Sequence, residues 1–181
     1  IPGYSFTLNS LVATQCGIPA KPIGFFKASS LKNIKNFLPN IKCLGDYTND
    51  LNYKNLFITS DEIENFGVKY FLLNHKYLNS NIYDVKKLKK LGYETSNFAW
   101  RGNKNKDGGM HDDVLLKASY DIIKKNLNNS EPFFMSIYTL DTHSPKGYPN
   151  PKCLKSMFHD PEIEKKFTIK NSVICTVSAL S

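Results

Sequence analysis

No apolar run in this 181-residue sequence reaches the roughly 18 to 20 residues that a helix needs to cross a bilayer. The sequence also lacks a Cys-x-x-Cys pair and a His-x-x-x-His pair, which argues against a structural zinc site built from close ligand pairs. It has no recognisable RNA-binding signature and no regular alternation of basic and aromatic residues. These absences disfavour a nucleic-acid partner, although a basic module that binds nucleic acid or anionic lipid stays open as an alternative.

Acidic residues are few in comparison with basic ones. The chain has 24 lysines and arginines against 16 aspartates and glutamates, which gives a net charge of +8. Such an excess favours anionic partners, but most of the lysines fall where helix surfaces are expected and are explained equally well as solvated faces. Hydrophobic residues make up 41% of the chain and aromatic residues 13%, which is enough for one buried core. We therefore predict one globular domain, or part of one.

The pattern of apolar and polar residues predicts helices that alternate with strands. Residues 112–127 form the clearest expected helix, because Leu115, Ala118 and Ile122 share one face. The run 133–138 follows this helix and is expected to be a fully buried strand, as in an α/β protein with parallel strands. The other expected elements are helices near 8–15, 28–38, 61–75, 84–91 and 163–180, a strand near 55–59 and an exposed loop over 97–109.

Two residues stand where chemistry is expected in such a fold. His143 follows the strand at 133–138, and ligands of open α/β sheets bind beyond the carboxyl ends of strands. It is interpreted either as a group that binds phosphate or moves a proton, or as an ordinary exposed loop histidine. Thr7 stands at the head of an apolar helix and is either a helix cap or a nucleophile that the helix dipole and a metal ion would activate.

The four cysteines, Cys16, Cys43, Cys153 and Cys175, are compatible with two states. An even number without close pairs favours two disulfides and an oxidising compartment. Four buried free thiols in a cytosolic protein remain the alternative at this point.

Five motifs together resemble those of the phosphoglycerol transferases that decorate osmoregulated periplasmic glucans, within the alkaline phosphatase and sulfatase superfamily. They occur in the family's order and at similar intervals. They are Phe6-Thr7 through Gln15-Cys16-Gly17-Ile18-Pro19, Ile41 through Asp46, Phe66 through Lys69, Gly109 through Asp113, and Thr139 through Pro145. The resemblance implies an α/β three-layer sandwich with a mostly parallel central sheet. Residues 1–181 would then be part of one sulfatase-like catalytic domain, truncated at both ends.

The resemblance also implies roles for individual residues. Thr7 matches the threonine that ligates a divalent metal, manganese or zinc, and attacks phosphorus to form a phosphorylated enzyme. Lys69 falls where the more distantly similar lipoteichoic acid synthases place a phosphate-binding arginine, and His143 falls on their substrate-binding histidine. Gly67 replaces the aromatic residue expected beside the basic group, and a histidine of the synthases is replaced near Ser60. These departures concern the specificity for headgroup and acceptor.

The cysteines fit the same resemblance, which implies the pairs Cys16–Cys43 and Cys153–Cys175. Each disulfide would stabilise the fold by roughly 3 kcal/mol on a chain-entropy model. The implied setting is the periplasm, in a parent protein anchored in the inner membrane. The implied reaction moves a phosphoglycerol group from an anionic phosphatidylglycerol-like lipid to a periplasmic glycan acceptor.

Part of the metal site that the resemblance requires is absent from the sequence. No carboxylate precedes Thr7 and the chain contains no Asp-His dipeptide, so Thr7 is the one expected metal ligand. We therefore expect this chain by itself to bind metal poorly and to be inactive.

Several alternatives keep or change the fold. A phosphoethanolamine transferase or a sulfatase would share it, but the Cys/Ser-x-Pro-x-Arg nucleophile context of sulfatases is missing. A non-catalytic relative that binds anionic glycan or lipid would also share it. A different class of enzyme would use Cys16 as a thiol nucleophile with His143 as its base, since Gln15-Cys16-Gly17 superficially resembles papain-like proteases.

Overall fold

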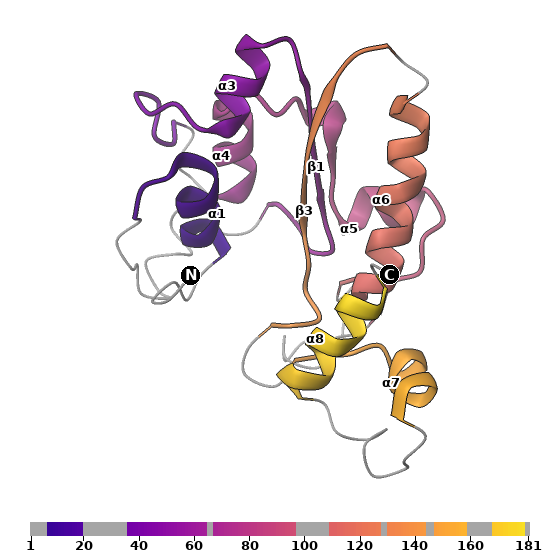
Figure 1. Cartoon of the computed structure of the whole chain (residues 1–181). Helices are drawn as coiled ribbons and strands as arrows, with labels where there is room; N and C mark the ends of the chain where they lie inside the picture. Colours follow the sequence, from indigo (N-terminus) through magenta and orange to yellow (C-terminus); the bar gives the residue numbers. More distant parts are fainter. Residues whose placement is uncertain are drawn as a thin grey trace. The chain divides into compact units, whose positions relative to one another are not determined.

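The computed structural model of the chain describes residues 7–19, 36–64, 67–96, 109–127, 130–143, 147–158 and 168–179 (Figure 1). The chain divides into two compact units, each made from several stretches of sequence. Unit 1 contains helices α1 (Thr7–Cys16), α3 (Leu44–Asp50) and α4 (Val68–Asn74), with the first parts of the two longer strands. Unit 2 contains α5 (Val85–Lys90), α6 (Asp112–Leu127), α7 (Pro151–Phe158) and α8 (Ile169–Ser178), with the carboxyl ends of those strands.

A parallel sheet of three strands runs through the chain in the order β2-β1-β3. Its members are β1 (Lys54–Thr59), β2 (Ile82–Tyr83) and β3 (Phe133–Tyr138), and a 3-10 turn, η2 (Asn79–Asn81), leads into β2. The Lys54 N–H donates to the Pro132 carbonyl at 2.8 Å, and six residues later the Ser60 N–H donates to the Tyr138 carbonyl at 3.4 Å. Both strands therefore run in the same direction, and the α/β class with a parallel sheet is confirmed.

The expectation that 133–138 is a fully buried strand was wrong in one respect. The strand exists, but its residues are half-buried, and Ile137 is 36% exposed. By contrast, residues 55–59 of the central strand β1 are all buried. Within the described residues β3 has a neighbour on only one side, and a strand at the edge of a sheet is covered less than a central one.

Three predicted helices are confirmed, and their ends follow local chemistry. α1 ends before Gly17, whose φ of 68° is the left-handed conformation that favours glycine after a helix, and the Gly17 N–H donates to the Ala13 carbonyl at 3.1 Å. α5 begins after Asp84, whose side chain accepts a bond from the Lys87 N–H. α6 has the predicted bounds of 112–127.

Other boundaries differ from the prediction. The helix expected over 61–75 is confined to α4, because Gly67 adopts a left-handed φ of 79° just before it. The helix expected over 163–180 begins at Ile169, since the Thr168 backbone is extended and its hydroxyl caps the helix. In the helix expected over 28–38 the described residues 36–38 are not helical, with Leu38 at a φ of 51°, and the remainder lies outside the described residues. Residues 97–108 of the expected loop also lie outside them, and α3, η2, β2 and α7 were not predicted.

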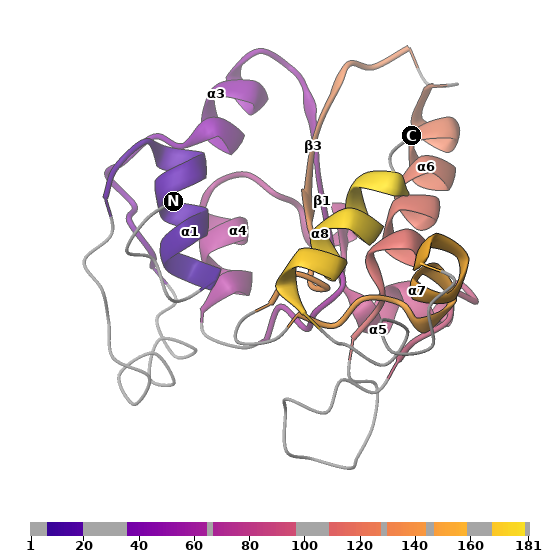
Figure 2. The same ribbon diagram turned by 60° about the horizontal axis from the view of Figure 1, so that its bottom comes forward.

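Each unit has its own apolar interior. In unit 1, α1, α3 and α4 lie together on one side of that unit's strand segments in both views (Figures 1 and 2). Its most buried side chains include Leu11, Phe57 and Phe71, and those of unit 2 include Leu88, Leu115 and Leu154. No helix among the described residues is long and apolar enough to cross a membrane.

Candidate functional site

The carboxyl end of α1 is fixed in unit 1 by a covalent bond and by buried hydrogen bonds. Cys16, its last residue, forms a disulfide with Cys43, which precedes α3. Gln15 donates to the Ser136 hydroxyl at 3.1 Å and accepts from the Tyr77 hydroxyl at 3.0 Å. Tyr77 is 1% exposed, and this burial raises the pKa of its hydroxyl to about 12, so it stays protonated as a donor. The orientation of α1 is thereby set from the end opposite Thr7.

Thr7 is the first residue of α1 and is exposed. The side chains that follow it alternate between burial and exposure as an amphipathic helix requires, with Leu8, Leu11 and Val12 buried. The first turn of a helix has backbone N–H groups without partners inside the helix, and the helix dipole favours negative charge there. The hydroxyl is therefore accessible, beside groups that favour an anion.

Lys69 belongs to the same unit as Thr7, and His143 belongs to the other. Lys69 is the second residue of α4, and its Nζ lies 2.7 Å from Glu64 Oε1. His143 is exposed in the turn after β3, where its backbone N–H donates to the Leu140 carbonyl at 2.9 Å. The roles predicted for Thr7, Lys69 and His143 stay predictions.

Two buried aspartates hold the loop that carries His143 in unit 2. Asp112 Oδ1 accepts from the N–H groups of Leu140 at 2.8 Å and Asp141 at 3.2 Å, and its Oδ2 accepts from the Thr176 hydroxyl at 2.6 Å. In return, Asp141 Oδ2 accepts from the Asp112 N–H at 3.1 Å, and its Oδ1 lies 2.9 Å from Nδ1 of His111. The loop is tied to the start of α6 by reciprocal bonds.

The pKa of Asp141 is raised to about 6, mainly by burial and also by the neighbouring Asp112 carboxylate, whereas the bond to His111 opposes the shift. These ties of Asp112 and Asp141 were not predicted from the sequence. A usable signal was the pair of aspartates at the start of the clearest helix, matched by an aspartate just after the last strand.

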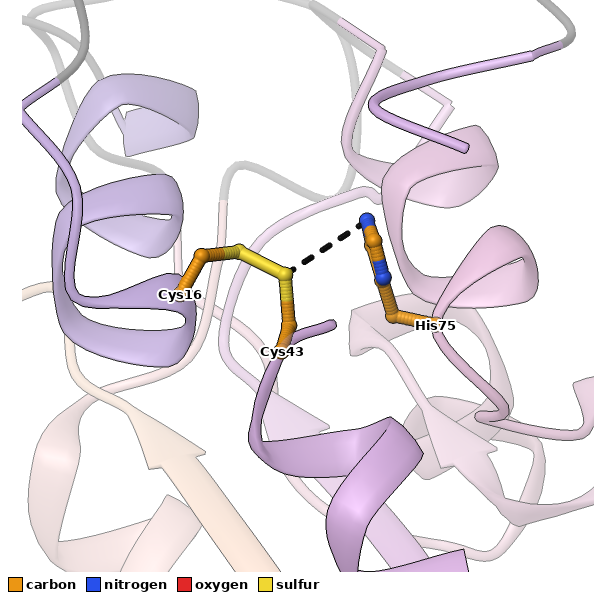
Figure 3. Close-up of side chains that lie close together, drawn as sticks. All are labelled: Cys16, Cys43 and His75. Atoms are coloured by element: carbon orange, nitrogen blue, oxygen red, sulfur yellow. Dashed lines mark hydrogen bonds between the residues drawn. A yellow bond between two sulfur atoms is a disulfide. The ribbon is translucent and has the colours of Figure 1, made fainter. Parts of the chain in front are cut away.

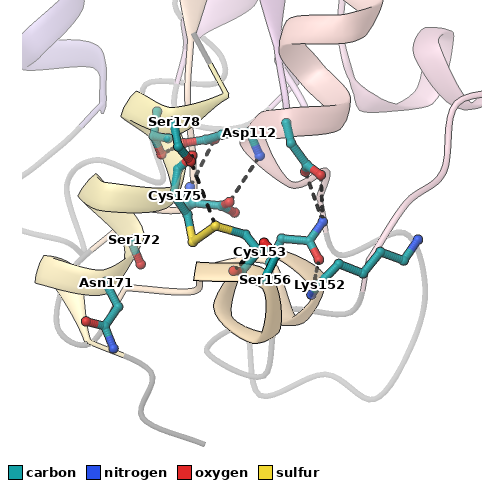
Figure 4. The surroundings of a disulfide bond; sticks show 12 residues. Asp112, Lys152, Cys153, Ser156, Asn171, Ser172, Cys175 and Ser178 are labelled. Atoms are coloured by element: carbon teal, nitrogen blue, oxygen red, sulfur yellow. Dashed lines mark hydrogen bonds between the residues drawn. A yellow bond between two sulfur atoms is a disulfide. The ribbon is translucent and has the colours of Figure 1, made fainter. Parts of the chain in front are cut away.

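The second disulfide, Cys153–Cys175, joins α7 to α8 in the same unit (Figure 4). Asn150, just before α7, donates to both carboxylate oxygens of Asp113 at 3.0 and 2.9 Å. Both disulfides follow the pairing that the resemblance implies. Because all four cysteines are paired, a Cys16 thiol nucleophile and the state with four free thiols are both excluded for this form of the chain.

His75 lies in a buried polar cluster (Figure 3). Its side chain is 2% exposed, its Nδ1 lies 2.7 Å from Asp46 Oδ2, and its Nε2 lies 3.6 Å from the Cys43 sulfur. Asp46 Oδ2 also accepts from the Cys43 N–H at 2.9 Å. A carboxylate only accepts hydrogen bonds, so Nδ1 carries the hydrogen and Nε2 faces the disulfide.

The described residues do not provide a ligand set for a divalent ion beside Thr7. Among them, the single group of three side chains that could hold a metal is Cys16, Cys43 and His75. Two of its three ligand atoms are the sulfurs of a disulfide, and a metal is bound by thiolates.

Comparison with protein families assigns the chain to a class of enzymes. The model of the sulfatase family matches residues 3–168, so this chain belongs to the sulfatase family. Members of this superfamily generally depend on divalent metals.

The chain is similar to several proteins named phosphoglycerol transferase I. It is 29% identical to the one from Xanthomonas axonopodis pv. citri over 160 residues, which are 88% of this chain and 21% of that protein. It is 31% identical over 147 residues to the one from Xanthomonas euvesicatoria pv. vesicatoria, covering 81% of this chain and 19% of that protein. It is 26% identical to the Escherichia coli protein over 158 residues, which are 87% of this chain and 19% of that protein. The chain thus spans about a fifth of the length of these relatives.

Two solved structures share the fold. A protein of the alkaline phosphatase superfamily from Vibrio parahaemolyticus matches with a TM-score of 0.67 and 19% identity, over 98% of this chain and 38% of that one. The lipoteichoic acid synthase LtaP from Listeria monocytogenes matches with a TM-score of 0.66 and 12% identity, over 96% of this chain and 38% of that one. The alkaline phosphatase-like fold that the motifs implied is confirmed.

Proposed function

We propose that this chain is part of the catalytic domain of a phosphoglycerol transferase in which Thr7 attacks phosphorus. Relatives with that name align with most of the chain, and the family match includes Thr7. The observation that carries the proposal is the exposed Thr7 at the amino end of α1, a helix whose other end is fixed by a disulfide. In this proposal residues 1–181 belong to one sulfatase-like domain.

The proposed reaction has two steps. Thr7 Oγ1 attacks the phosphorus of a phosphatidylglycerol-like donor, the bond from phosphorus to the diacylglycerol oxygen breaks, and the threonine proton ends on that oxygen. The hydroxyl of an acceptor sugar then attacks the phosphorus held by Thr7, the bond between phosphorus and Thr7 Oγ1 breaks, and the proton of the sugar hydroxyl ends on Oγ1, so that the phosphoglycerol group passes to the sugar. The N–H groups at the start of α1 favour the anionic phosphate in both steps. A divalent ion, manganese or zinc, would supply Lewis-acid chemistry in the whole enzyme. The described residues beside Thr7 do not form a ligand set for such an ion.

Lys69 and His143 are proposed to hold the phosphate oxygens. Lys69 would exchange its bond to Glu64 for one to the substrate, and this exchange costs little because a partly exposed ion pair is worth about 0–1 kcal/mol. His143 is exposed at the carboxyl end of β3, where ligands of parallel sheets bind. Both groups suit an anionic headgroup.

The proposed setting is the periplasm, in a membrane-anchored parent protein, with an anionic phospholipid donor, a glycan acceptor and no nucleic acid. Two disulfides support an oxidising compartment, where such bonds persist. The net charge of +8 complements an anionic donor.

The test is transfer from phosphatidylglycerol with a labelled headgroup to a periplasmic glucan, by the full-length protein that carries this chain. We expect Thr7→Ala to abolish transfer, because no other atom replaces Oγ1, and Thr7→Ser to retain part of it. Thr14→Ala is the matched control, since Thr14 is an exposed threonine of the same helix. Full turnover in Thr7→Ala would refute the assignment, and transfer from phosphatidylethanolamine alone would favour the phosphoethanolamine alternative.

A further inference from the structure

The cluster of Cys16, Cys43 and His75 has a feature that a structural histidine does not require. The ligand atoms of these three side chains lie within 4.8 Å of one another in unit 1 (Figure 3). His75 directs Nδ1–H to Asp46 and Nε2 to the Cys43 sulfur. Histidines that bind metals almost always donate their second ring N–H to a carboxylate or carbonyl in this way, which fixes the ring and makes the free nitrogen a better ligand.

One separation in the cluster, that between the Cys43 sulfur and the free nitrogen of His75, agrees with tetrahedral zinc. A zinc ion about 2.3 Å from sulfur and about 2.0 Å from nitrogen would separate those two ligand atoms by about 3.6 Å. The observed separation between Cys43 Sγ and His75 Nε2 is 3.6 Å. Two thiolates on one zinc would lie about 3.8 Å apart, so the bonded sulfurs must separate before an ion can enter. In the oxidised chain the two sulfurs are bonded to each other and therefore cannot bind zinc as thiolates.

We propose that reduction of the Cys16–Cys43 disulfide converts this cluster into a zinc site with two thiolates and one imidazole as ligands. Asp46 remains bonded to His75 as the group that orients the ring, and water completes the coordination. This site is distinct from the proposed phosphotransfer chemistry, because Thr7 stands at the other end of the ten-residue helix α1. At about 1.5 Å per residue, the two ends lie roughly 14 Å apart along the axis.

The conversion needs an external two-electron reductant, and a dithiol is the class of reductant that we propose. A thiolate of the dithiol attacks the half-buried Cys16 sulfur, the disulfide bond breaks, and the Cys43 sulfur leaves beside His75. The second thiol of the reductant then releases Cys16, and the dithiol ends as a disulfide after giving two electrons. Zinc binding displaces the two thiol protons into solvent.

The Cys153–Cys175 disulfide provides an internal comparison. Among the described residues, no second group of three histidine, cysteine, aspartate or glutamate side chains lies close enough together to hold a metal ion. The Ser178 hydroxyl lies 4.0 Å from the Cys153 sulfur, and a serine hydroxyl is a poor zinc ligand. Reduction of this second bond should yield two thiols without a metal site.

The experiment reduces the full chain with a phosphine, removes metal, and titrates the chain with cobalt(II), a spectroscopic substitute for zinc. We expect one equivalent of cobalt, a thiolate-to-cobalt charge-transfer band, and displacement of cobalt by zinc. The band should persist in the double variant Cys153→Ser/Cys175→Ser and vanish in Cys16→Ser/Cys43→Ser. Asp46→Asn should weaken binding by about 10- to 100-fold, as loss of an orienting carboxylate does elsewhere.

Circular dichroism of each reduced sample separates a folded site from metal binding by an unfolded chain. No charge-transfer band from the reduced wild-type chain, folded or unfolded, would overturn the proposal. A band of equal strength in Cys16→Ser/Cys43→Ser would also overturn it, since the thiols would then come from the other pair. Metal at the phosphotransfer site gives no thiolate band, and Thr7→Ala should leave the result unchanged.

Discussion

Replacement of Asp112 by alanine should destabilise the chain strongly, because one buried carboxylate satisfies three donors. The side chain accepts from the N–H groups of Leu140 and Asp141 and from the Thr176 hydroxyl, at distances from 2.6 to 3.2 Å. Leu140 is 5% exposed and Asp141 is 1% exposed, so water does not readily replace the lost acceptor. Each buried donor left without a partner costs about 1–3 kcal/mol, and we expect a total loss of about 3–5 kcal/mol.

Asp112→Asn is the matched control for this loss. Its amide oxygen can keep the two backbone bonds, and the Thr176 hydroxyl can rotate to accept from the amide nitrogen. The expected cost is about 1–2 kcal/mol, because only the contribution of the charge is lost.

Urea unfolding measures both variants. With a slope near 2 kcal/mol per molar urea, a loss of 4 kcal/mol lowers the midpoint by about 2 M, while the slope itself stays constant. The reasoning fails if Asp112→Ala loses less than about 1 kcal/mol, or if the alanine and asparagine variants are equally stable.

Two further predictions concern stability. Gly45→Ala should cost about 1–3 kcal/mol, because its Cβ would stand 2.7 Å from a ring carbon of Tyr77 and against a backbone carbonyl. Gly92→Ala tests a different cause, because its Cβ meets no atom within 4 Å and its loss of about 1–2 kcal/mol comes from its φ of 94°. A loss below about 1 kcal/mol in Gly45→Ala would contradict the steric cause. Asp141 has a pKa of about 6 in the fold against 3.8 in the unfolded chain, so the folded state binds its proton more tightly. This contribution to stability is complete below pH 3.8 and is lost as the pH rises through 6. As the pH is raised from 4 to 7, the urea midpoint should therefore fall less in Asp141→Asn than in the wild-type chain. Identical pH profiles of the two midpoints would contradict this prediction.

Much of the secondary structure of this chain is local information and was predictable from its residues. α1, α5 and α6 have helical apolar spacing with glycine or aspartate at their ends, and β1 is a short apolar run. The order of the motifs was sufficient to indicate the family that the comparisons confirm. Thr7, Lys69 and His143 were also found in this way, and their roles await the transfer assay.

Burial and long-range pairing, by contrast, depended on the tertiary structure. The composition of β3 suggests a buried strand, but its position in the sheet leaves it half-exposed, because burial depends on neighbouring elements. The bonds of Asp112 to Asp141 and of His75 to Asp46 join residues about 30 positions apart, and no local pattern marks such partners. Periodicity and caps act within a few residues, so the sequence by itself determined helices α1, α5 and α6, the central strand and the family. Only folding decided which aspartate binds the His143 loop and which histidine faces a disulfide.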